Sequence, residues 1–473
     1  MPVSYSAPHP LRRRRSAPAA GRARLAERLA ARPLAILLGL ALVLPTATGC
    51  ADSGQILRSA DVFGLFERPE RRLPGERRPV LDSPDRLVVD PEGAGSPVSL
   101  PEQNSNSDWA QPGGVPTNAP GHLAYAGSGG TAWSTSVARL DRRGRLTTSP
   151  IVYQGQVYVM DPQGNLSAYS LSGGGRSWSA SLRPEGQRGS GYRGGIAADG
   201  GLLVAATPFG QVHGVNPGSG GVAWTAEMGA PARSAPTVAN GRAYIVTADN
   251  VLHALDVSDG SSLWTFRGTG EQAGVLGNAS PAVVGNRVIV PYSSGEIIAF
   301  DVESGDPQWY DALTGASRFT TVSGLNDVVA KPVVYDGVVY AVSVSGRMIA
   351  VNAQSGERLW AQNVASSHTP AVAGNSIFVA TMSGEVVAFN RSNGRVRWRQ
   401  SLASEEGSVD VAGPLLAGGQ LWVGTSDGRV VTLNPSDGSV VSTQSIGNPV
   451  YIGPIAAGGR IFVLDNGGSL TAL

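Results

Sequence analysis

Few residues of this chain have side chains suited to acid–base, redox or metal chemistry. The five histidines are widely separated in the sequence: His9, His122, His213, His253 and His368. His213 and His253 fall in short apolar segments, at the position that isoleucine occupies in equivalent segments (Ile298 and Ile349). A metal site needs several donor side chains converging on one point. We therefore interpret these two histidines as strand residues and predict no metal site.

Catalytic motifs are missing or out of place. Gly189–Gly194 matches G-x-G-x-x-G, but an apolar strand follows it where a dinucleotide site requires a helix. Neither G-x-S-x-G nor H-E-x-x-H occurs in the chain. Acidic residues are scattered in turns, where Asp256, Asp301 and Asn352 share one position and therefore one structural role. The sequence thus predicts a protein that is not an enzyme and binds no cofactor.

The only cysteine, Cys50, follows a sequence typical of an export signal. Eight arginines precede an apolar run from Pro33 to Pro45, which at about thirteen residues is too short to cross a bilayer of roughly 30 Å. The small residues Ala47-Thr48-Gly49 then lead into Cys50, which resembles the bacterial lipobox. We expect residues 1–49 to be a lipoprotein signal peptide and Cys50 to carry the lipid anchor. The alternative is an ordinary signal peptide with a chance cysteine.

Residues beyond Cys50 bear on location and partners. Residue 51 is alanine and not aspartate, and in the known sorting pattern this favours the outer membrane. Removal of residues 1–49, which hold eight arginines and one glutamate, leaves 29 basic and 35 acidic residues, a balance unsuited to nucleic-acid binding. Residues 50–108 are rich in Pro, Gly, Ser and charge without an apolar period. We expect an irregular linker there.

A repeated unit occupies the chain from about residue 131. It contains a proline, three short apolar strands separated by glycine-containing turns, and a tryptophan. The tryptophans are Trp133, Trp178, Trp224, Trp264, Trp309, Trp360 and Trp398. The prolines are Pro150, Pro236, Pro281, Pro332, Pro370, Pro414 and Pro454, with Gly195 in the remaining position. Spacings of 38 to 51 residues are typical of four-stranded propeller blades.

The two ends of the repeat predict how the ring closes. The last unit begins at Pro454 and stops after its third strand, whereas Trp133 has no proline-led strands before it. The segment near Trp133 should therefore supply the fourth strand of the last blade, which leaves no open sheet edge at the join. The fold class is then all-β, an eight-bladed β-propeller over residues 109–473. The eighth tryptophan position holds Ser442, so we expect weaker packing at one blade junction.

Length variation falls at one place in the unit. Proline to tryptophan spans 28 residues in six units and 29 in one, whereas tryptophan to the next proline position varies from 10 to 23. These variable connections must share one face of the propeller, and variable loops on a rigid scaffold are typical of binding surfaces. The long connections carry several arginines and apolar residues: Arg183, Arg188, Arg193, Arg267, Arg318, Val275, Leu276 and Phe319.

The repeat resembles those of pyrroloquinoline-quinone dehydrogenases and their non-enzymatic relatives. With the lipobox and eight units, it is most similar to the BamB family of outer-membrane β-barrel assembly lipoproteins, over roughly residues 108–473. Asp108–Gly114 is similar to that family's entry into the propeller. The resemblance implies a non-catalytic scaffold that binds the POTRA region of the barrel-inserting subunit through loops on one face.

Two stretches carry that contact in the family, one with a Leu-Arg-Gly pattern and one with Asp-Val-Asp. The matching positions here are Val275-Leu276-Gly277 and Asp327-Val328-Val329, which match only in part. Leu276 replaces the arginine and Val329 the second aspartate, and Arg267 or Arg318 could replace the lost positive charge.

Two other functions stay open from the sequence. One is an envelope propeller that binds a polysaccharide or a different envelope complex, since this also needs a grooved loop face. The other is a quinone-dependent dehydrogenase, whose family resemblance implies calcium and adjacent cysteines. The single cysteine at the lipidation position makes the dehydrogenase the weaker alternative.

Overall fold

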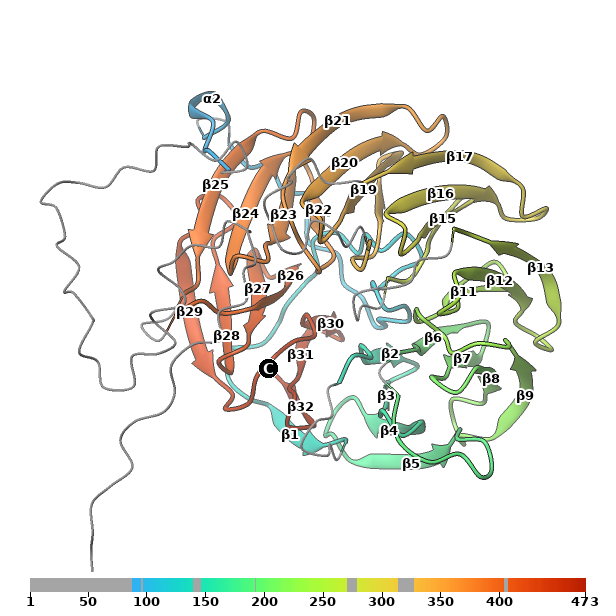
Figure 1. The fold of residues 1–473 in the computed structure, drawn as a ribbon. Coiled ribbons are helices and arrows are strands. Elements are labelled where there is room, and N and C mark those ends of the chain that lie inside the picture. Colours follow the sequence, from blue (N-terminus) through green and yellow to red (C-terminus); the bar gives the residue numbers. More distant parts are fainter. Residues whose placement is uncertain are drawn as a thin grey trace, which may run out of the picture. The chain divides into compact units, whose positions relative to one another are not determined.

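The protein forms a ring of eight four-stranded antiparallel sheets in the computed structural model (Figure 1). The structure describes residues 87–94, 97–138, 146–191, 193–269, 279–313, 327–403 and 407–473. The expectations for the signal peptide, residues 1–49, and for the lipidated Cys50 lie outside these ranges. The eight-bladed β-propeller predicted from the repeat is confirmed.

Each blade runs from an inner strand beside the central channel to an outer strand at the rim. Blades 1 to 4 comprise β2 (Ile151–Tyr153), β3 (Gln156–Met160), β4 (Asn165–Ser170), β5 (Arg176–Ser181); β6 (Gly195–Asp199), β7 (Leu202–Ala206), β8 (Gln211–Val215), β9 (Val222–Glu227); β10 (Thr237–Ala239), β11 (Arg242–Val246), β12 (Val251–Asp256), β13 (Ser262–Arg267); and β14 (Ala282–Val284), β15 (Arg287–Pro291), β16 (Glu296–Asp301), β17 (Pro307–Ala312).

The remaining blades follow the same order around the ring. Blades 5 to 8 comprise β18 (Val333–Tyr335), β19 (Val338–Val342), β20 (Arg347–Asn352), β21 (Arg358–Asn363); β22 (Ala371–Ala373), β23 (Ser376–Ala380), β24 (Glu385–Asn390), β25 (Val396–Ser401); β26 (Val411–Ala417), β27 (Gln420–Thr425), β28 (Arg429–Leu433), β29 (Val440–Ser445); and β30 (Ile455–Ala457), β31 (Arg460–Leu464), β32 (Ser469–Ala472), β1 (Trp133–Ser136).

Burial differs between the inner and outer strands of a blade. Second and third strands such as β3 and β4 are buried over four consecutive residues, because neighbouring blades cover both faces of the sheet. The outer strand β5 instead alternates exposed and half-buried residues. The near-continuous apolar runs of the repeat are therefore the middle strands, and the polar run around each tryptophan is the rim.

The ring closes by pairing strands from opposite ends of the described chain. β1 pairs antiparallel with β32, with Trp133 opposite Ala472 and Ser136 opposite Ser469. The predicted closure is therefore confirmed, and blade 8 combines strands from both ends. Because β32 and β1 come from distant parts of the chain, no turn joins the third and fourth strands of blade 8.

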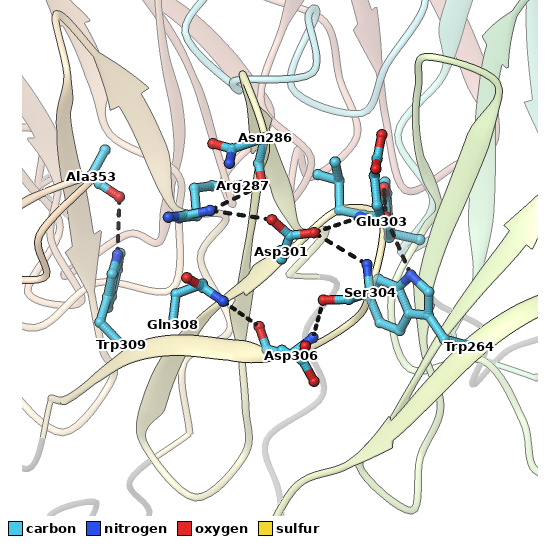
Figure 2. A network of polar contacts seen from close by, with 12 residues as sticks. Trp264, Asn286, Arg287, Asp301, Glu303, Ser304, Asp306, Gln308, Trp309 and Ala353 are labelled. Carbon is cyan, nitrogen blue, oxygen red and sulfur yellow. Dashed lines mark hydrogen bonds and ion pairs between the residues drawn. The ribbon is translucent and has the colours of Figure 1, made fainter.

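Each repeat tryptophan joins its own blade to the next one. The indole Nε1 of Trp309 donates a hydrogen bond to the carbonyl oxygen of Ala353 in blade 5, at 2.9 Å, and Trp264 does the same to Val302 in blade 4, at 3.2 Å (Figure 2). The ring also stacks on a glycine of that turn: a Cβ at Gly356, where φ is +75°, would lie 2.6 Å from Trp309. Seven junctions repeat this arrangement.

Ser442 occupies the tryptophan position at the junction where this arrangement cannot form. Its partner would be the third-to-fourth turn of blade 8, which does not exist because the chain ends meet there. Ser442 Oγ instead lies 2.8 Å from Thr432 Oγ1 within blade 7. The missing tryptophan thus coincides with the missing turn.

In blades 2 to 7 an Asp or Asn residue at the end of the third strand caps the turn beneath the tryptophan. Asp301 accepts hydrogen bonds from the backbone N–H groups of Glu303 and Ser304 (Figure 2). Asn352 accepts them from Gln354 and Ser355, and Asp256 accepts one from Ser258. These contacts confirm the shared structural role predicted for Asp256, Asp301 and Asn352.

A segment that we call the strap, residues 97–126, crosses one face of the ring (Figure 1). Its backbone forms hydrogen bonds with the free edges of inner strands. Trp109 pairs with Val152 of β2, the Pro116 carbonyl accepts from Val283 of β14, and Leu123 donates to Leu416 of β26. Residues 97–108, expected to be linker, are part of the strap.

The strap reaches all eight blades. Ala110 and Thr117 accept backbone bonds from β6 and β18, and Gln111 bonds to the Val238 backbone in β10. Ser99 and Asn106 bond to the first turns of blades 6 and 8. The inner ends of the eight sheets are therefore linked by one continuous piece of chain.

Residues 87–94, which include the short helix α2 (Pro91–Ala94), lie against the outer strand of blade 6. Asp90 donates its backbone N–H to Val396, and Arg395 forms ion pairs with Asp90 at 3.1 Å and Glu92 at 2.9 Å. Within the described ranges, no helix has the length and apolarity needed to cross a bilayer.

Candidate functional site: the long-connection face and the central channel

Strand order divides the loops between two faces. The connections between blades and the turns joining second to third strands share one face, which we call the long-connection face. The strap covers the channel on the other face, where the first and third turns of each blade lie. The long-connection face therefore carries the connections of variable length, whereas the strap occupies the opposite face.

The structure describes part of the residues predicted to bind a partner there. Arg267 and Asp327 lie within the described ranges, whereas Val275, Leu276, Gly277 and Arg318 lie outside them. The described ends of their connections, Gly268 and Ala279 for one and Leu313 and Asp327 for the other, lie on the long-connection face.

Arg267 ends β13 and points into solvent. Its side chain is 68% exposed and lies 3.2 Å from the carboxylate of Asp249 on the neighbouring turn. Burial alone would raise the pKa of Asp249, but hydrogen bonds from Thr247 and Arg267 lower it below its ordinary value. This exposed pair contributes little stability, so the guanidinium remains accessible to an acidic group of a partner.

Asp327 is buried, which the sequence did not indicate. Its side chain is 2% exposed and forms an ion pair with Arg233, whose side chain is 4% exposed. Arg233 also donates to the carbonyl oxygens of Pro291, at 3.1 Å, and Val328, at 3.3 Å. Burial lowers the pKa of Arg233, and the adjacent Asp327 carboxylate opposes this change.

The Arg233–Asp327 pair joins three blades. Arg233 belongs to the connection between blades 2 and 3, Pro291 ends β15 in blade 4, and Asp327 belongs to the connection between blades 4 and 5. In this conformation Asp327 cannot itself touch a partner. It instead fixes the end of the longest connection, so its influence on partner binding would be through the position of that loop.

Another arginine orders the connection between blades 1 and 2. Arg183 Nε donates to the carbonyl oxygen of Gln163 at 2.9 Å, and its guanidinium lies 5.7 Å from the ring centroid of Phe209 in blade 2. This is a cation–π geometry across a blade junction. Arg188, five residues later, is exposed.

The central channel holds a cavity of about 100 Å³ between the strap and the inner strands of blades 1, 5, 6, 7 and 8. Trp109 and Asn118 of the strap line one side, and Lys331, His368 and Thr369 line the side nearer the long-connection face. The Lys331 backbone N–H donates to Thr369 Oγ1 at 3.2 Å. The sequence analysis did not assign these residues to a site, although Lys331 is the only lysine of the chain.

The two titratable groups in the cavity have perturbed acidity. Burial lowers the pKa of Lys331 to about 8. Burial, together with the nearby Lys331 charge, lowers the pKa of His368 to about 4. At neutral pH the cavity therefore contains an ammonium group and a neutral imidazole, which carries one N–H donor.

His213 and His253, the two histidines predicted to be strand residues, are confirmed in that role. His213 lies opposite Ala205 and Thr225, and His253 opposite Ile245 and Thr265. Burial lowers the pKa of both. Among the described residues, no group of three or more His, Cys, Asp or Glu side chains is placed to hold a metal ion. Gly189–Gly194 leads into β6, as predicted.

Comparison of the sequence with models of known protein families identifies the group of propellers to which this chain is related. The family model described as outer membrane protein assembly factor BamB matches residues 184–400 and 382–473, which include blades 2 to 7 entirely. The chain belongs to the BamB family. This confirms the resemblance inferred from the repeats.

Individual BamB proteins are moderately similar. The chain is 29% identical over 239 residues to BamB of Yersinia pestis, covering 50% of this chain and 61% of the relative. It is 28% identical over 249 residues to BamB of Escherichia coli strain K12, covering 52% and 64%. The matched region thus spans less than two thirds of either BamB relative.

Solved structures show the same fold. The crystal structure of BamB from Moraxella catarrhalis has a TM-score of 0.62 and 21% identity, with 72% of this chain and 99% of that chain covered. A europium-containing methanol dehydrogenase has a TM-score of 0.61 and 13% identity, with 76% and 89% covered. At these identities both similarities establish the propeller fold alone.

Proposed function

We propose that this chain is a non-catalytic scaffold lipoprotein of outer-membrane β-barrel protein assembly, bound to the barrel-inserting subunit through the long-connection face. Membership of the BamB family is the observation that carries this proposal. The geometry supports it, because the opposite face is occupied by the strap while the variable connections remain outside the ring's core.

A scaffold fits the side chains better than a dehydrogenase does. The described residues offer no converging set of metal ligands, and the sequence has no cysteine beyond Cys50. Where the strap crosses the channel, Trp109 and Gln111 bond to the inner strands and fill the space on that side. These features support a binding role and no redox step.

The proposal includes attachment to the membrane through Cys50. Lipidation at this residue, with Ala51 after it, would place the propeller on the periplasmic side of the outer membrane. Residues 87–94 lie at the rim of blade 6, so the chain between Cys50 and the propeller would reach the ring there.

Two kinds of residue would determine partner binding. Val275, Leu276, Gly277, Arg267 and Arg318 would contact the POTRA region directly, with Arg267 as an exposed cation at the rim of the site. Asp327 would act through Arg233 by holding the connection between blades 4 and 5 in place.

The decisive experiment is a pull-down of the full-length tagged lipoprotein from gently solubilised native membranes, with mass spectrometry of the co-purifying proteins. We expect the barrel-inserting subunit to be recovered. Recovery of a different envelope complex or a polysaccharide in its place would overturn the proposal and favour the alternative envelope role.

Variants then locate the contact. Replacement of Val275 and Leu276 by alanine should reduce recovery of the barrel-inserting subunit. Glu303→Ala is the matched control, since Glu303 is an exposed residue in a turn on the opposite face. Unchanged recovery with the double variant would refute the proposed contact, even where the partner itself is correct.

A further inference from the structure

Lys331 is unusual both in its type and in its position. Of the 37 lysine and arginine residues in the chain, 36 are arginine and only Lys331 is lysine. The single lysine lies in the central-channel cavity, immediately before Pro332 and the inner strand β18. Lysine is a compact, strongly hydrated point charge, whereas arginine is a larger planar group, so a narrow channel accommodates the former more readily.

The cavity presents this charge without a counter-charge among its lining residues. Lys331 is the only Lys or Arg among the described residues that line the cavity, and none of these residues is Asp or Glu. Within the described ranges, no ion pair involves Lys331. Lys331 is half-buried, and an unpaired charge that has lost part of its hydration is unfavourable, so an anion bound beside it would offset that cost.

Further hydrogen-bond donors lie next to the ammonium group. Thr369 Oγ1 accepts the Lys331 backbone N–H, which leaves the hydroxyl hydrogen to be donated elsewhere. The backbone N–H of His368 donates to Ser366 Oγ at 3.0 Å, and the Ser366 hydroxyl in turn donates to the Ala380 carbonyl oxygen of β23 at 2.6 Å, which fixes the backbone at His368. Lys331, His368 and Thr369 are thereby held on one side of the cavity.

We propose that the central channel contains a binding site for a small oxyanion, with the Lys331 ammonium as the charged donor and the Thr369 hydroxyl and His368 ring N–H as additional donors. The volume of about 100 Å³ admits several non-hydrogen atoms, since one water needs about 10–15 Å³ measured in the same way. Inorganic phosphate and small carboxylates fit this size and charge. The strap closes the far side, so the anion enters from the long-connection face.

The acidity of the site supports this assignment and fixes its pH dependence. The pKa of Lys331, lowered to about 8, leaves the ammonium largely protonated at neutral pH. His368, with its pKa lowered to about 4, is the other titratable group facing the cavity and stays neutral there. A bound anion favours the charged amine and so raises the pKa of Lys331, and binding weakens above about pH 8.

A single lysine permits a direct test. Reductive methylation of the full-length chain with ¹³C-formaldehyde labels Lys331 and any free α-amino group, and a Lys331→Arg sample identifies the lysine resonance by its loss. Inorganic phosphate is titrated against sodium chloride at equal ionic strength. We expect a saturable shift with phosphate and a rise in the pKa of the labelled amine. A shift no larger than that caused by chloride overturns the proposal.

Two variants complete the test through thermal unfolding. Phosphate should raise the Tm of the parent chain and of Arg188→Met, an exposed control on the long-connection face, but not of Lys331→Met. Thr369→Val should weaken phosphate binding by about tenfold, as loss of a hydrogen bond to a charged group predicts. An equal phosphate response in Lys331→Met refutes the site. The result is independent of partner binding, so it can fail while the proposed scaffold function stands.

Discussion

Replacement of Trp309 by alanine tests whether the repeat tryptophans hold the ring together. The indole is 8% exposed, packs over Gly356 of the next blade and donates a hydrogen bond to the Ala353 carbonyl oxygen at 2.9 Å. Trp309→Ala removes the packing between blades 4 and 5 and leaves that carbonyl without its donor.

The magnitude follows from these contacts. Truncation of a buried tryptophan to alanine costs about 3–5 kcal/mol, of which the lost hydrogen bond accounts for about 1 kcal/mol. A cooperative unit of about 380 residues has an unfolding entropy of roughly 0.8 kcal/mol/K, so the Tm should fall by about 4–6 °C.

The assay is differential scanning calorimetry of parent and variants at one protein concentration. Gln308→Ala is the matched control, because Gln308 is an exposed neighbour on β17 whose amide reaches only the Asp306 carbonyl, and its Tm should stay within about 1 °C. Ser442→Trp should bring no gain, since blade 8 has no third-to-fourth turn for the ring to pack on.

Either of two results would refute this reasoning. A fall in Tm of less than about 1 °C for Trp309→Ala would mean that the indole contributes no more than an ordinary surface residue. A rise in Tm for Ser442→Trp of several degrees would mean that the tryptophan does not depend on the neighbouring turn.

Three further predictions concern buried polar groups. Asp327→Ala should lower the free energy of unfolding by about 3–5 kcal/mol in urea denaturation, because it leaves the Arg233 guanidinium buried without its carboxylate; a cost below about 1 kcal/mol would contradict the burial of the pair. The free energy of unfolding should fall as the pH is lowered from about 6.5 to 4, because unfolded His368 binds a proton in this range while the folded residue, with its pKa lowered to about 4, does not. His368→Asn should remove roughly 3 kcal/mol of this pH dependence. An unchanged pH profile in the variant would contradict the lowered pKa of His368. Gln111→Ala should accelerate amide hydrogen exchange at Val238, whose backbone N–H donates to the Gln111 side chain at 3.0 Å, and unchanged protection there would mean that the strap does not depend on this anchor.

The blades could be predicted from the sequence because each repeats the same local requirements. A proline, an apolar run, a turn glycine and a tryptophan recur at nearly fixed spacing, and each serves a contact within one blade or with the next. Closure of the ring also followed, since the unit containing Trp133 lacked three strands and the unit beginning at Pro454 lacked one.

The strap and the buried ion pair were not predicted, for two different physical reasons. The strap binds mainly through backbone groups, as where Trp109 pairs with Val152, and such bonds leave no apolar period in the sequence. The Arg233–Asp327 pair joins residues 94 positions apart, and an acidic residue in a loop ordinarily indicates an exposed one. The proximity of Lys331 and His368 was not predicted either. The two residues are far apart in the sequence and lie close together because each precedes the inner strand of one of two adjacent blades.

The strap also bears on how the ring loses its structure. In repeat proteins whose units contact only their neighbours, stability is roughly a sum of local terms, and unfolding can start at any weak interface and spread. Here the junction at Ser442 would be such a starting point. A segment that bonds to all eight blades couples distant ones, so opening at that junction should also release contacts on the far side of the channel. We therefore expect the ring to unfold in a single cooperative transition and not blade by blade.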